Sequence, residues 1–223
     1  YTSAANLRNS VSSKITDGDL KNYLQSNMTY TLHKPIRKKM THNKVKAVAI
    51  DNVWAADLGD FQNISKFNNG VKYILFVIDV FSKYLFVRTL KSKKGEEVAN
   101  QFADIIIKSE RKPALLHSDE GGELWNSHMN KIMKELDILH YATGSQMKSG
   151  VAERVIRSIK QRMYKYFTHK NTFHYLDVID QIVLNYNKTV HSTTKYKPID
   201  VNSKNSDAIY EDVFADEPVS RDK

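Results

Sequence analysis

Three carboxylates stand in sequence settings that suit metal-dependent chemistry. Asp57 interrupts the apolar run VWAADLGDF, and Asp119 follows the apolar run in LLHSDEGGEL. Glu153 lies near the start of a strongly patterned helical segment, GVAERVIRSIK. Two carboxylates from a sheet and one from a helix can converge on a pair of divalent cations. Such a pair activates a nucleophile and stabilises a leaving oxygen, so the pattern predicts cleavage and joining of phosphodiester bonds.

The sequence settings of these carboxylates favour a metal site over ordinary surface charge. Asp and Glu are hard oxygen donors, which Mg²⁺ and Mn²⁺ prefer. Most acidic residues are solvated, and this remains the alternative for all three. A carboxylate within an apolar strand is costly unless it is paired or bound to a metal, which favours the metal for Asp57. Two neighbours have plainer interpretations: His117 packs or hydrogen-bonds, and Asp79 accepts hydrogen bonds from turn amides.

The helix predicted at 151–168 places two cations beside the third carboxylate. Its apolar stripe consists of Val155, Ile156, Ile159, Met163 and Tyr166, with the small Ala152 at the centre. Glu153, Arg157 and Lys160 stand at i, i+4 and i+7, so they share the adjoining face of the helix. The two cations are interpreted either as contacts to a bound polyanion or as ordinary solvated charges.

The order of apolar segments along the chain is typical of an α/β layer fold. Apolar runs predict strands at VWAADLGDF, 71–80, 83–90, ALLHSD and 138–143. Helical periods predict helices at 95–110, 127–137, 151–168 and 173–190, with a glycine-bounded loop at 144–150. The fold class is therefore α/β with a mixed sheet.

The composition favours an acidic partner and a reducing compartment. The 223 residues carry a net charge of +9 and contain no cysteine, which excludes disulfides and cysteine-bound zinc within this chain. No apolar run reaches membrane-spanning length, and no signal peptide is recognisable. Because the chain begins at Tyr1 rather than Met, we expect it to be a processed or excised fragment.

Charge and the pattern of apolar residues divide the chain into three segments. Residues 1–44 form a predicted basic N-terminal extension, residues 45–200 a predicted core, and residues 201–223 a predicted acidic linker. Residues 1–50 hold nine Lys and Arg against two Asp and Glu, whereas residues 201–223 hold three against six. The basic excess therefore precedes the core and the acidic excess follows it.

The N-terminal extension is predicted to combine a short helix with an extended basic arm. Asp17 or Asp19 is suited to cap the helix, and a proline favours extended backbone in the arm. The arm carries Arg37, Lys38 and Lys39. We interpret these cations either as a nucleic-acid or nuclear-import patch or as part of a solvated linker.

Four motifs in this order resemble the retroviral and retrotransposon integrases. HSDEGGEL resembles a strand end of that family, and GVAERVIRSIK resembles the start of its catalytic helix. VIDVFSKYLFV resembles its two-strand turn, and YNKTVHSTTKYKP resembles its closing element. The resemblance runs from about Trp54 to Pro198, nearly two-thirds of the chain. The flanking YTLHKPIRKK and MYKYFTHKNTFHYLDVID are most similar to the integrases of Maverick/Polinton elements, which are large DNA transposons.

The resemblance implies an RNase H-like fold, a mixed five-stranded sheet flanked by helices. It implies that Asp57, Asp119 and Glu153 are catalytic and hold two Mg²⁺ or Mn²⁺ ions. The implied enzyme is a metal-dependent polynucleotidyl transferase and endonuclease, which processes the ends of an element and joins them to target DNA. Arg157 and Lys160 match positions that resemble contacts to the DNA ends.

The resemblance also implies further DNA contacts, partners and a location. Gln146 and Lys148 resemble residues of a mobile active-site loop that contacts DNA. The implied partners are double-stranded DNA, as element ends and target, and further copies of the chain in a homo-oligomer. We expect no membrane partner, and a nuclear location or a nucleoprotein complex rather than secretion.

The sequence departs from the family pattern at several positions. Glu120 stands where the family usually has Asn, and Val155 and Ile156 replace the usual aromatic residue and Asn. An extra carboxylate beside Asp119 can weaken its metal geometry or add an outer-shell ligand. Two alternatives therefore stay open: a catalytically silent DNA-binding or assembly protein with the same fold, and an RNase H-like nuclease without strand transfer.

Overall fold

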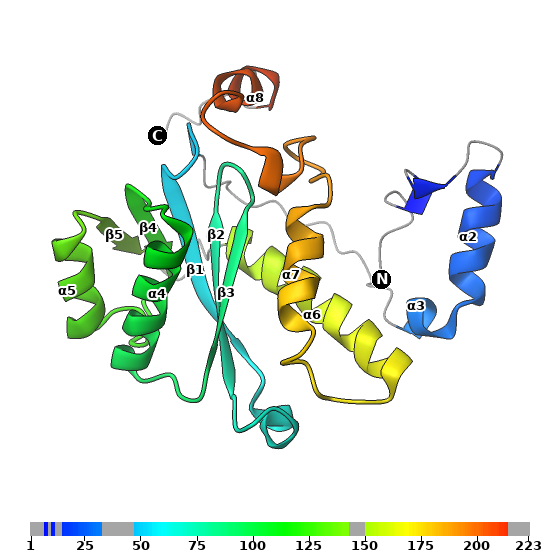
Figure 1. The fold of residues 1–223 in the computed structure, drawn as a ribbon, viewed down its shortest axis with the longest axis horizontal. Helices are drawn as coiled ribbons and strands as arrows, with labels where there is room; N and C mark the ends of the chain where they lie inside the picture. Colours follow the sequence, from blue (N-terminus) through cyan, green and yellow to red (C-terminus); the bar gives the residue numbers. More distant parts are fainter. Residues whose placement is uncertain (1–6, 9, 12–14, 33–46, 143–149, 214–223) are drawn as a thin grey trace, which may run out of the picture.

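The sheet contains five strands, with helices on both of its faces (Figure 1). The computed structural model describes residues 7–8, 10–11, 15–32, 47–142 and 150–213. The strands are β1 (Val53–Asp60), β2 (Tyr73–Asp79), β3 (Leu85–Leu90), β4 (Leu115–Ser118) and β5 (Leu139–Ala142). Their order is β3-β2-β1-β4-β5; β1, β2 and β3 pair antiparallel, whereas β4 pairs parallel with β1 and β5. The predicted α/β fold with a mixed sheet is confirmed.

Four helices follow the predicted order. They are α4 (Gly95–Ser109), α5 (Ser127–Glu135), α6 (Gly150–Lys170) and α7 (Ile179–Asn187). A further helix, α8 (Ser206–Val213), was not predicted, and short 3-10 turns lie at Gln62–Phe67 and Pro198–Asp200. Figure 1 shows α4 and α5 on one side of the sheet and α6 and α7 on the other. Within the described part of the chain, no helix is long and apolar enough to cross a membrane.

Alternation along β1 divides its side chains between two apolar layers. Trp54 and Ala56 pack in the layer beneath α4 and α5, whereas Val53 and Ala55 pack in the layer beneath α6 and α7. Successive side chains of a strand point to opposite faces, so Asp57 belongs to the face that α6 covers. The period of the strand therefore directs this carboxylate toward the helix that carries Glu153.

The helix predicted at 173–190 is shorter in the structure, because α7 begins only at Ile179. The buried side-chain amide of Asn68, in the turn after β1, holds the backbone just before α7 in a non-helical form. The Nδ2 of Asn68 donates to the carbonyl of Phe173 (2.9 Å), and the N–H of Tyr175 donates to the Oδ1 of Asn68 (2.8 Å). These bonds replace the ones that a continuous helix would make.

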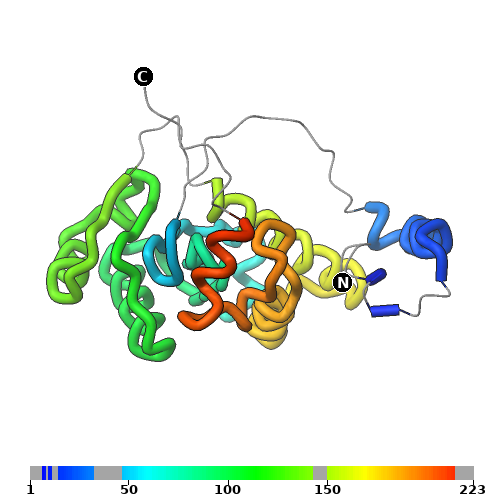
Figure 2. The backbone as a smooth tube through the Cα atoms, turned by 90° about the horizontal axis from the view of Figure 1, so that it is seen from above, coloured from blue at the N-terminus to red at the C-terminus, as the bar shows by residue number. Residues whose placement is uncertain are grey.

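The ends of the described chain pack onto this sandwich. Helices α2 (Asp17–Ser26) and α3 (Met28–Leu32) precede the sheet, and α3 lies against α6, where the Nζ of Lys165 is 4.8 Å from the ring centroid of Tyr30. Figure 2 shows α2, in blue, at the end of the molecule opposite the green α4 and α5. At the other terminus, Ile209 of α8 is buried in the core.

The N-cap of α2 differs from the prediction. Thr16, rather than Asp17 or Asp19, is the capping residue, and its hydroxyl accepts from the N–H of Asp19 (3.2 Å). Asp19 returns the contact by accepting from the N–H of Thr16 (3.0 Å), which completes a capping box. The basic arm with Arg37, Lys38 and Lys39 lies outside the described residues.

Candidate active site

Asp57 is a half-buried carboxylate in the middle of β1. Its Oδ1 accepts a hydrogen bond from the N–H of Leu58 (2.7 Å). The pKa of Asp57 is raised to about 6, first by burial and then by the nearby carboxylates of Asp119, Glu153 and Glu123, against the lowering effect of that hydrogen bond. The three predicted carboxylates therefore lie close enough together to repel one another electrostatically.

Asp119 follows β4 directly and is exposed. Its Oδ1 accepts from the N–H of Gly121 (3.3 Å). A side chain at Gly121 would have its Cβ 2.9 Å from the carboxyl carbon of Glu123, so the glycine leaves space for this additional carboxylate. The sequence analysis missed Glu123; its position four residues after Asp119 in a glycine-containing turn was the available signal. Glu120 is exposed in the same turn.

A hydrogen-bonded group behind Asp119 holds the end of β4. The hydroxyl of Ser118 donates to the carbonyl of Asp119 (2.9 Å), accepts from the Nε1 of Trp125 (3.0 Å), and lies 2.9 Å from the Nε2 of His140. The rings of Trp125 and His140 stack with centroids 4.1 Å apart. Burial lowers the pKa of His140 to about 4, so the imidazole is neutral at physiological pH. This packed group fixes the backbone that carries Asp119.

Two side chains near the site have the plain roles that the sequence predicted. His117 is buried, with its ring centroid 5.0 Å from that of Tyr141, and burial lowers its pKa. Asp79 accepts from the N–H of Phe81 (3.1 Å) and the hydroxyl of Ser82 (2.5 Å) in the turn after β2. Asp79 also pairs with Arg111 (2.8 Å), a contact that the sequence analysis missed.

Glu153 lies in the first turn of α6 and shares a groove with Asp57. The positive end of the helix dipole favours a carboxylate there. The groove has a volume of about 480 Å³ and is lined by Asp57, Leu58, Glu153, Ile156, Arg157, Lys160, Gln161 and Tyr164. Three of the predicted residues of α6, one carboxylate and two cations, thus face the same space as Asp57. The sequence analysis missed Tyr164, although it continues the same line at i+11 from Glu153.

The two predicted cations of this groove differ in their surroundings. The Nζ of Lys160 lies 5.0 Å from the ring centroid of Phe61. Its charge contributes to the lowered pKa of Asp60, which is due first to the hydrogen bond from the N–H of Gln62. Arg157 is exposed, and its side chain makes no ion pair within the described part of the molecule. Arg157 is thus available to a ligand.

Carboxylate oxygens suit a divalent cation, but the described residues do not form a complete set of metal ligands in this structure. Neighbouring carboxylates repel one another, which raises the pKa of Asp57, and a cation that binds between them relieves this repulsion. However, among the described residues no group of three or more His, Cys, Asp or Glu side chains is arranged to hold a metal ion. Asp119 does not line the groove that contains Asp57 and Glu153. Gln146 and Lys148 lie outside the described residues.

The apolar stripe of α6 and the predicted closing element both support the groove. The buried residues of the stripe include Val155, Ile159 and Met163, but Phe167 is buried more deeply than the predicted Tyr166. In the closing element, Asn187 makes two hydrogen bonds to the backbone of Leu85: its Oδ1 accepts from the N–H (2.9 Å), and its Nδ2 donates to the carbonyl (3.0 Å). These bonds connect α7 to β3.

Comparisons with known proteins agree with this architecture. Residues 47–148 match the family model of the integrase core domain. The chain is 38% identical over 136 residues to a transposon-derived protein of Caenorhabditis elegans; the match covers 61% of this chain and 48% of that protein. The chain therefore spans about half the length of that relative.

Solved structures of viral integrases share the fold. A structure of the simian T-cell lymphotropic virus intasome in complex with the PP2A regulatory subunit B56 gamma has a TM-score of 0.63 at 17% identity, covering 89% of this chain and 69% of that chain. The HTLV-2 integrase catalytic core domain in complex with magnesium, in its dimeric form, has a TM-score of 0.57 at 18% identity, covering 69% and 97%. The chain thus has the RNase H-like fold of integrase catalytic cores, and residues 47–148 are similar to the integrase core domain.

Proposed function

We propose that the chain is the core of a DNA strand transferase of the integrase and transposase type. The observation that carries the proposal is the groove in which Asp57, its pKa raised, faces Glu153 and the cations of α6. Asp57 is held close to the carboxylates of Asp119 and Glu153, which lowers the stability of the fold. Such an arrangement is suited to bind divalent cations. The family of residues 47–148 supports the same activity.

In this proposal each residue of the groove has a defined role. Asp57, Asp119 and Glu153 hold two Mg²⁺ or Mn²⁺ ions, as the magnesium complex of the HTLV-2 core domain supports. When bound, such ions activate a water or a DNA 3′-hydroxyl and stabilise the leaving oxygen. Arg157 and Lys160 bind phosphates of the element end and orient it along α6. Gln146 and Lys148 bind DNA at the same site.

The wider setting of the enzyme is part of the proposal. The partners are double-stranded element ends and target DNA, and the enzyme acts as a homo-oligomer in the nucleus or in a nucleoprotein complex. The dimeric form of the HTLV-2 core domain supports an oligomer. The transposon-derived relative supports a mobile-element origin, and we propose a Maverick/Polinton-type element on the basis of the flanking motifs.

A joining assay with pre-cut oligonucleotide ends tests the activity. We expect joined products only with Mg²⁺ or Mn²⁺, and none from Asp57→Asn. The matched control is Asp60→Asn, because Asp60 lies on the same strand but outside the groove. Cleavage without joining would replace the proposal with a nuclease. Asp57→Asn products equal to those of the parent would remove Asp57 from the site.

A second candidate function is a catalytically silent DNA-binding or assembly protein with this fold. The open arrangement of the carboxylates and the extra carboxylates at Glu120 and Glu123 favour it. Thermal unfolding with and without Mn²⁺ separates the candidates, because a ligand that binds only the native state raises the melting temperature. An active site should give a rise that Asp57→Asn abolishes, whereas a silent protein should give none that depends on Asp57.

We also propose the division into a basic extension (residues 1–44), a core (residues 45–200) and an acidic linker (residues 201–223), of which α8 packs onto the core through Ile209. Arg37, Lys38 and Lys39 would add sequence-independent affinity for DNA. Deleting residues 1–44 should leave the core folded by circular dichroism and weaken duplex binding in a salt-sensitive manner. A deletion variant that fails to fold would assign the extension to the core.

A further inference from the structure

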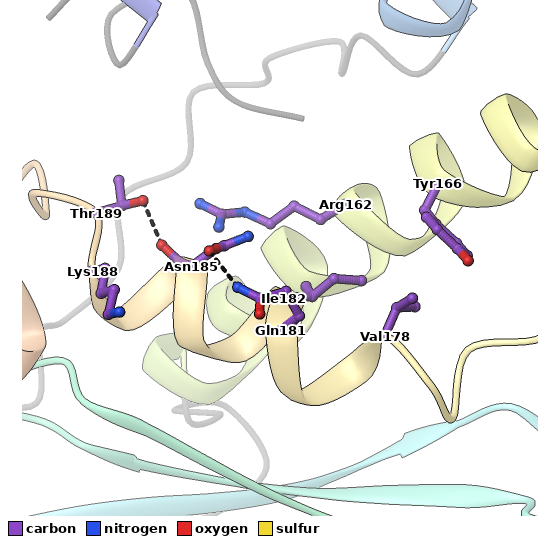
Figure 3. Close-up of a pocket in the computed structure, with 8 residues that line it drawn as sticks. All are labelled: Arg162, Tyr166, Val178, Gln181, Ile182, Asn185, Lys188 and Thr189. Atoms are coloured by element: carbon purple, nitrogen blue, oxygen red, sulfur yellow. Dashed lines mark hydrogen bonds between the residues drawn. The ribbon is translucent and has the colours of Figure 1, made fainter. Parts of the chain in front are cut away.

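A second groove lies between α6 and α7 (Figure 3). Its volume is about 510 Å³, and both helices line it. Arg162 follows Glu153 by nine residues, which is half a turn away on a helix of about 3.6 residues per turn. This α6/α7 groove is therefore separate from the groove that contains Asp57.

Arg162 is a half-buried cation in the α6/α7 groove. Its guanidinium carbon lies 5.6 Å from the ring centroid of Tyr186, and burial lowers its pKa. Figure 3 shows the side chain extending from α6 toward Asn185, near the end of α7, and Thr189, which follows that helix. Within the described residues, no carboxylate pairs with Arg162, and the second cation of the lining is Lys188. A half-buried cation without an acidic partner loses part of its hydration without compensation, so the groove is suited to an anionic group.

The rest of the lining combines apolar surface with paired amides. Val178, Ile182 and Tyr166 provide the apolar part. The Nε2 of Gln181 donates to the Oδ1 of Asn185 (2.9 Å). This bond leaves the Oε1 of Gln181 as an acceptor and the Nδ2 of Asn185 as a donor for a ligand. A peptide backbone uses both kinds of group, whereas a DNA phosphate accepts hydrogen bonds only.

We propose that the α6/α7 groove binds a peptide segment of a partner protein in which an acidic side chain stands beside an apolar one. Arg162 binds the carboxylate, and the apolar lining takes up the neighbouring side chain. The Gln181–Asn185 pair binds the peptide backbone. The concave shape, the apolar part and the amide acceptor favour a peptide over duplex DNA, whose phosphates contact cations and backbone N–H groups.

Selection from a displayed library of random peptides tests this assignment directly. Peptides are selected on the parent chain, and the affinities of selected peptides are measured by fluorescence anisotropy. We expect a shared Asp or Glu next to an apolar residue. We expect affinity to fall at least about tenfold in Arg162→Gln, and by a similar factor when the peptide acid is replaced by its amide. Lys188→Gln, at the rim, should weaken binding less.

Two controls make the outcome decisive. Arg157→Gln, on the opposite face of α6, should leave peptide binding unchanged. The melting temperature of Arg162→Gln should not fall, because the variant removes a half-buried cation that has no acidic partner. Selected peptides without a shared acid, or peptide binding that persists in both Arg162→Gln and Lys188→Gln, would overturn the proposal. So would duplex DNA that binds through Arg162 and displaces the peptide. The assay needs no metal and no joining, so its result is independent of the proposed enzyme activity.

Discussion

The two grooves beside α6 place the same residue type in opposite settings. On one side, Arg157 is exposed and shares its groove with the carboxylates of Asp57 and Glu153. On the other side, Arg162 is packed over an aromatic ring among amides and apolar side chains, in a lining that contains no carboxylate. A groove with both signs of charge can bind cations and phosphates together. A groove with cations alone selects an anion.

The contrast between Arg157 and Arg162 shows that the position of a cation around a helix determines its surroundings more than its position along the sequence does. Arg157 and Arg162 are only five residues apart, yet the helical period turns one toward β1 and the other toward α7. The following predictions test whether the two grooves are as independent as this geometry indicates.

The largest effect should come from Asp57→Asn. If Asp57 holds metal ions as proposed, removing its carboxylate should lower the rate of strand joining by at least about 1000-fold, because several kcal/mol of charge stabilisation would be lost. The rate is measured with pre-cut ends in Mn²⁺. Arg162→Gln, in the α6/α7 groove, should join at the parent rate. Equal losses in both variants would show that the grooves are coupled.

The same substitution should stabilise the metal-free protein in a pH-dependent way. The pKa of Asp57 is about 6 in the fold, against an ordinary value of 3.8, so ionisation opposes folding as the pH rises between these values. Asp57→Asn should match the parent near pH 4 and exceed it by up to about 2 kcal/mol above pH 6, by chemical denaturation. Buried histidines such as His140, whose lowered pKa destabilises the fold on acidification, cancel in the comparison. A difference that does not vary with pH would contradict the raised pKa.

Arg157→Gln and Lys160→Gln should each weaken duplex binding by about tenfold at low salt. Each is expected to remove about one phosphate contact, and the slope of log affinity against log salt should fall by about 0.9. The slope of Arg162→Gln should remain that of the parent. Affinity titrations at several salt concentrations measure the slopes. If Arg162→Gln also flattens the slope, DNA reaches both sides of α6.

The smallest effect should come from the paired tyrosines of α6. Tyr164 lines the groove of Asp57, whereas Tyr166 lines the α6/α7 groove. Tyr164→Ala should weaken binding of a DNA end by roughly fivefold if a base stacks on the ring. Tyr166→Ala should leave DNA binding unchanged and weaken only the acidic peptide. Anisotropy with labelled DNA and labelled peptide gives both affinities, and a reversed pattern would contradict the assignment of the two grooves.

The sequence alone was sufficient for features that depend on local period. The apolar run VWAADLGDF predicted β1, and the order of apolar runs predicted an α/β fold with a mixed sheet. The stripe of α6 predicted which side of the helix is buried and which side carries Glu153, Arg157 and Lys160. These features follow from the geometry of a single strand or helix, which a few neighbouring residues specify.

Only the tertiary structure decided features that depend on partners distant in the sequence. Asn68 binds the backbone of Phe173, a residue 105 positions away, so the predicted helix begins later than its apolar pattern indicated. Glu123 joins the carboxylates around Asp57 because a turn folds back beside β1. The α6/α7 groove exists because two helices pack at a particular spacing, and no local pattern around Arg162 predicts its burial. Long-range packing sets such contacts, and periodicity within one element carries no information about it.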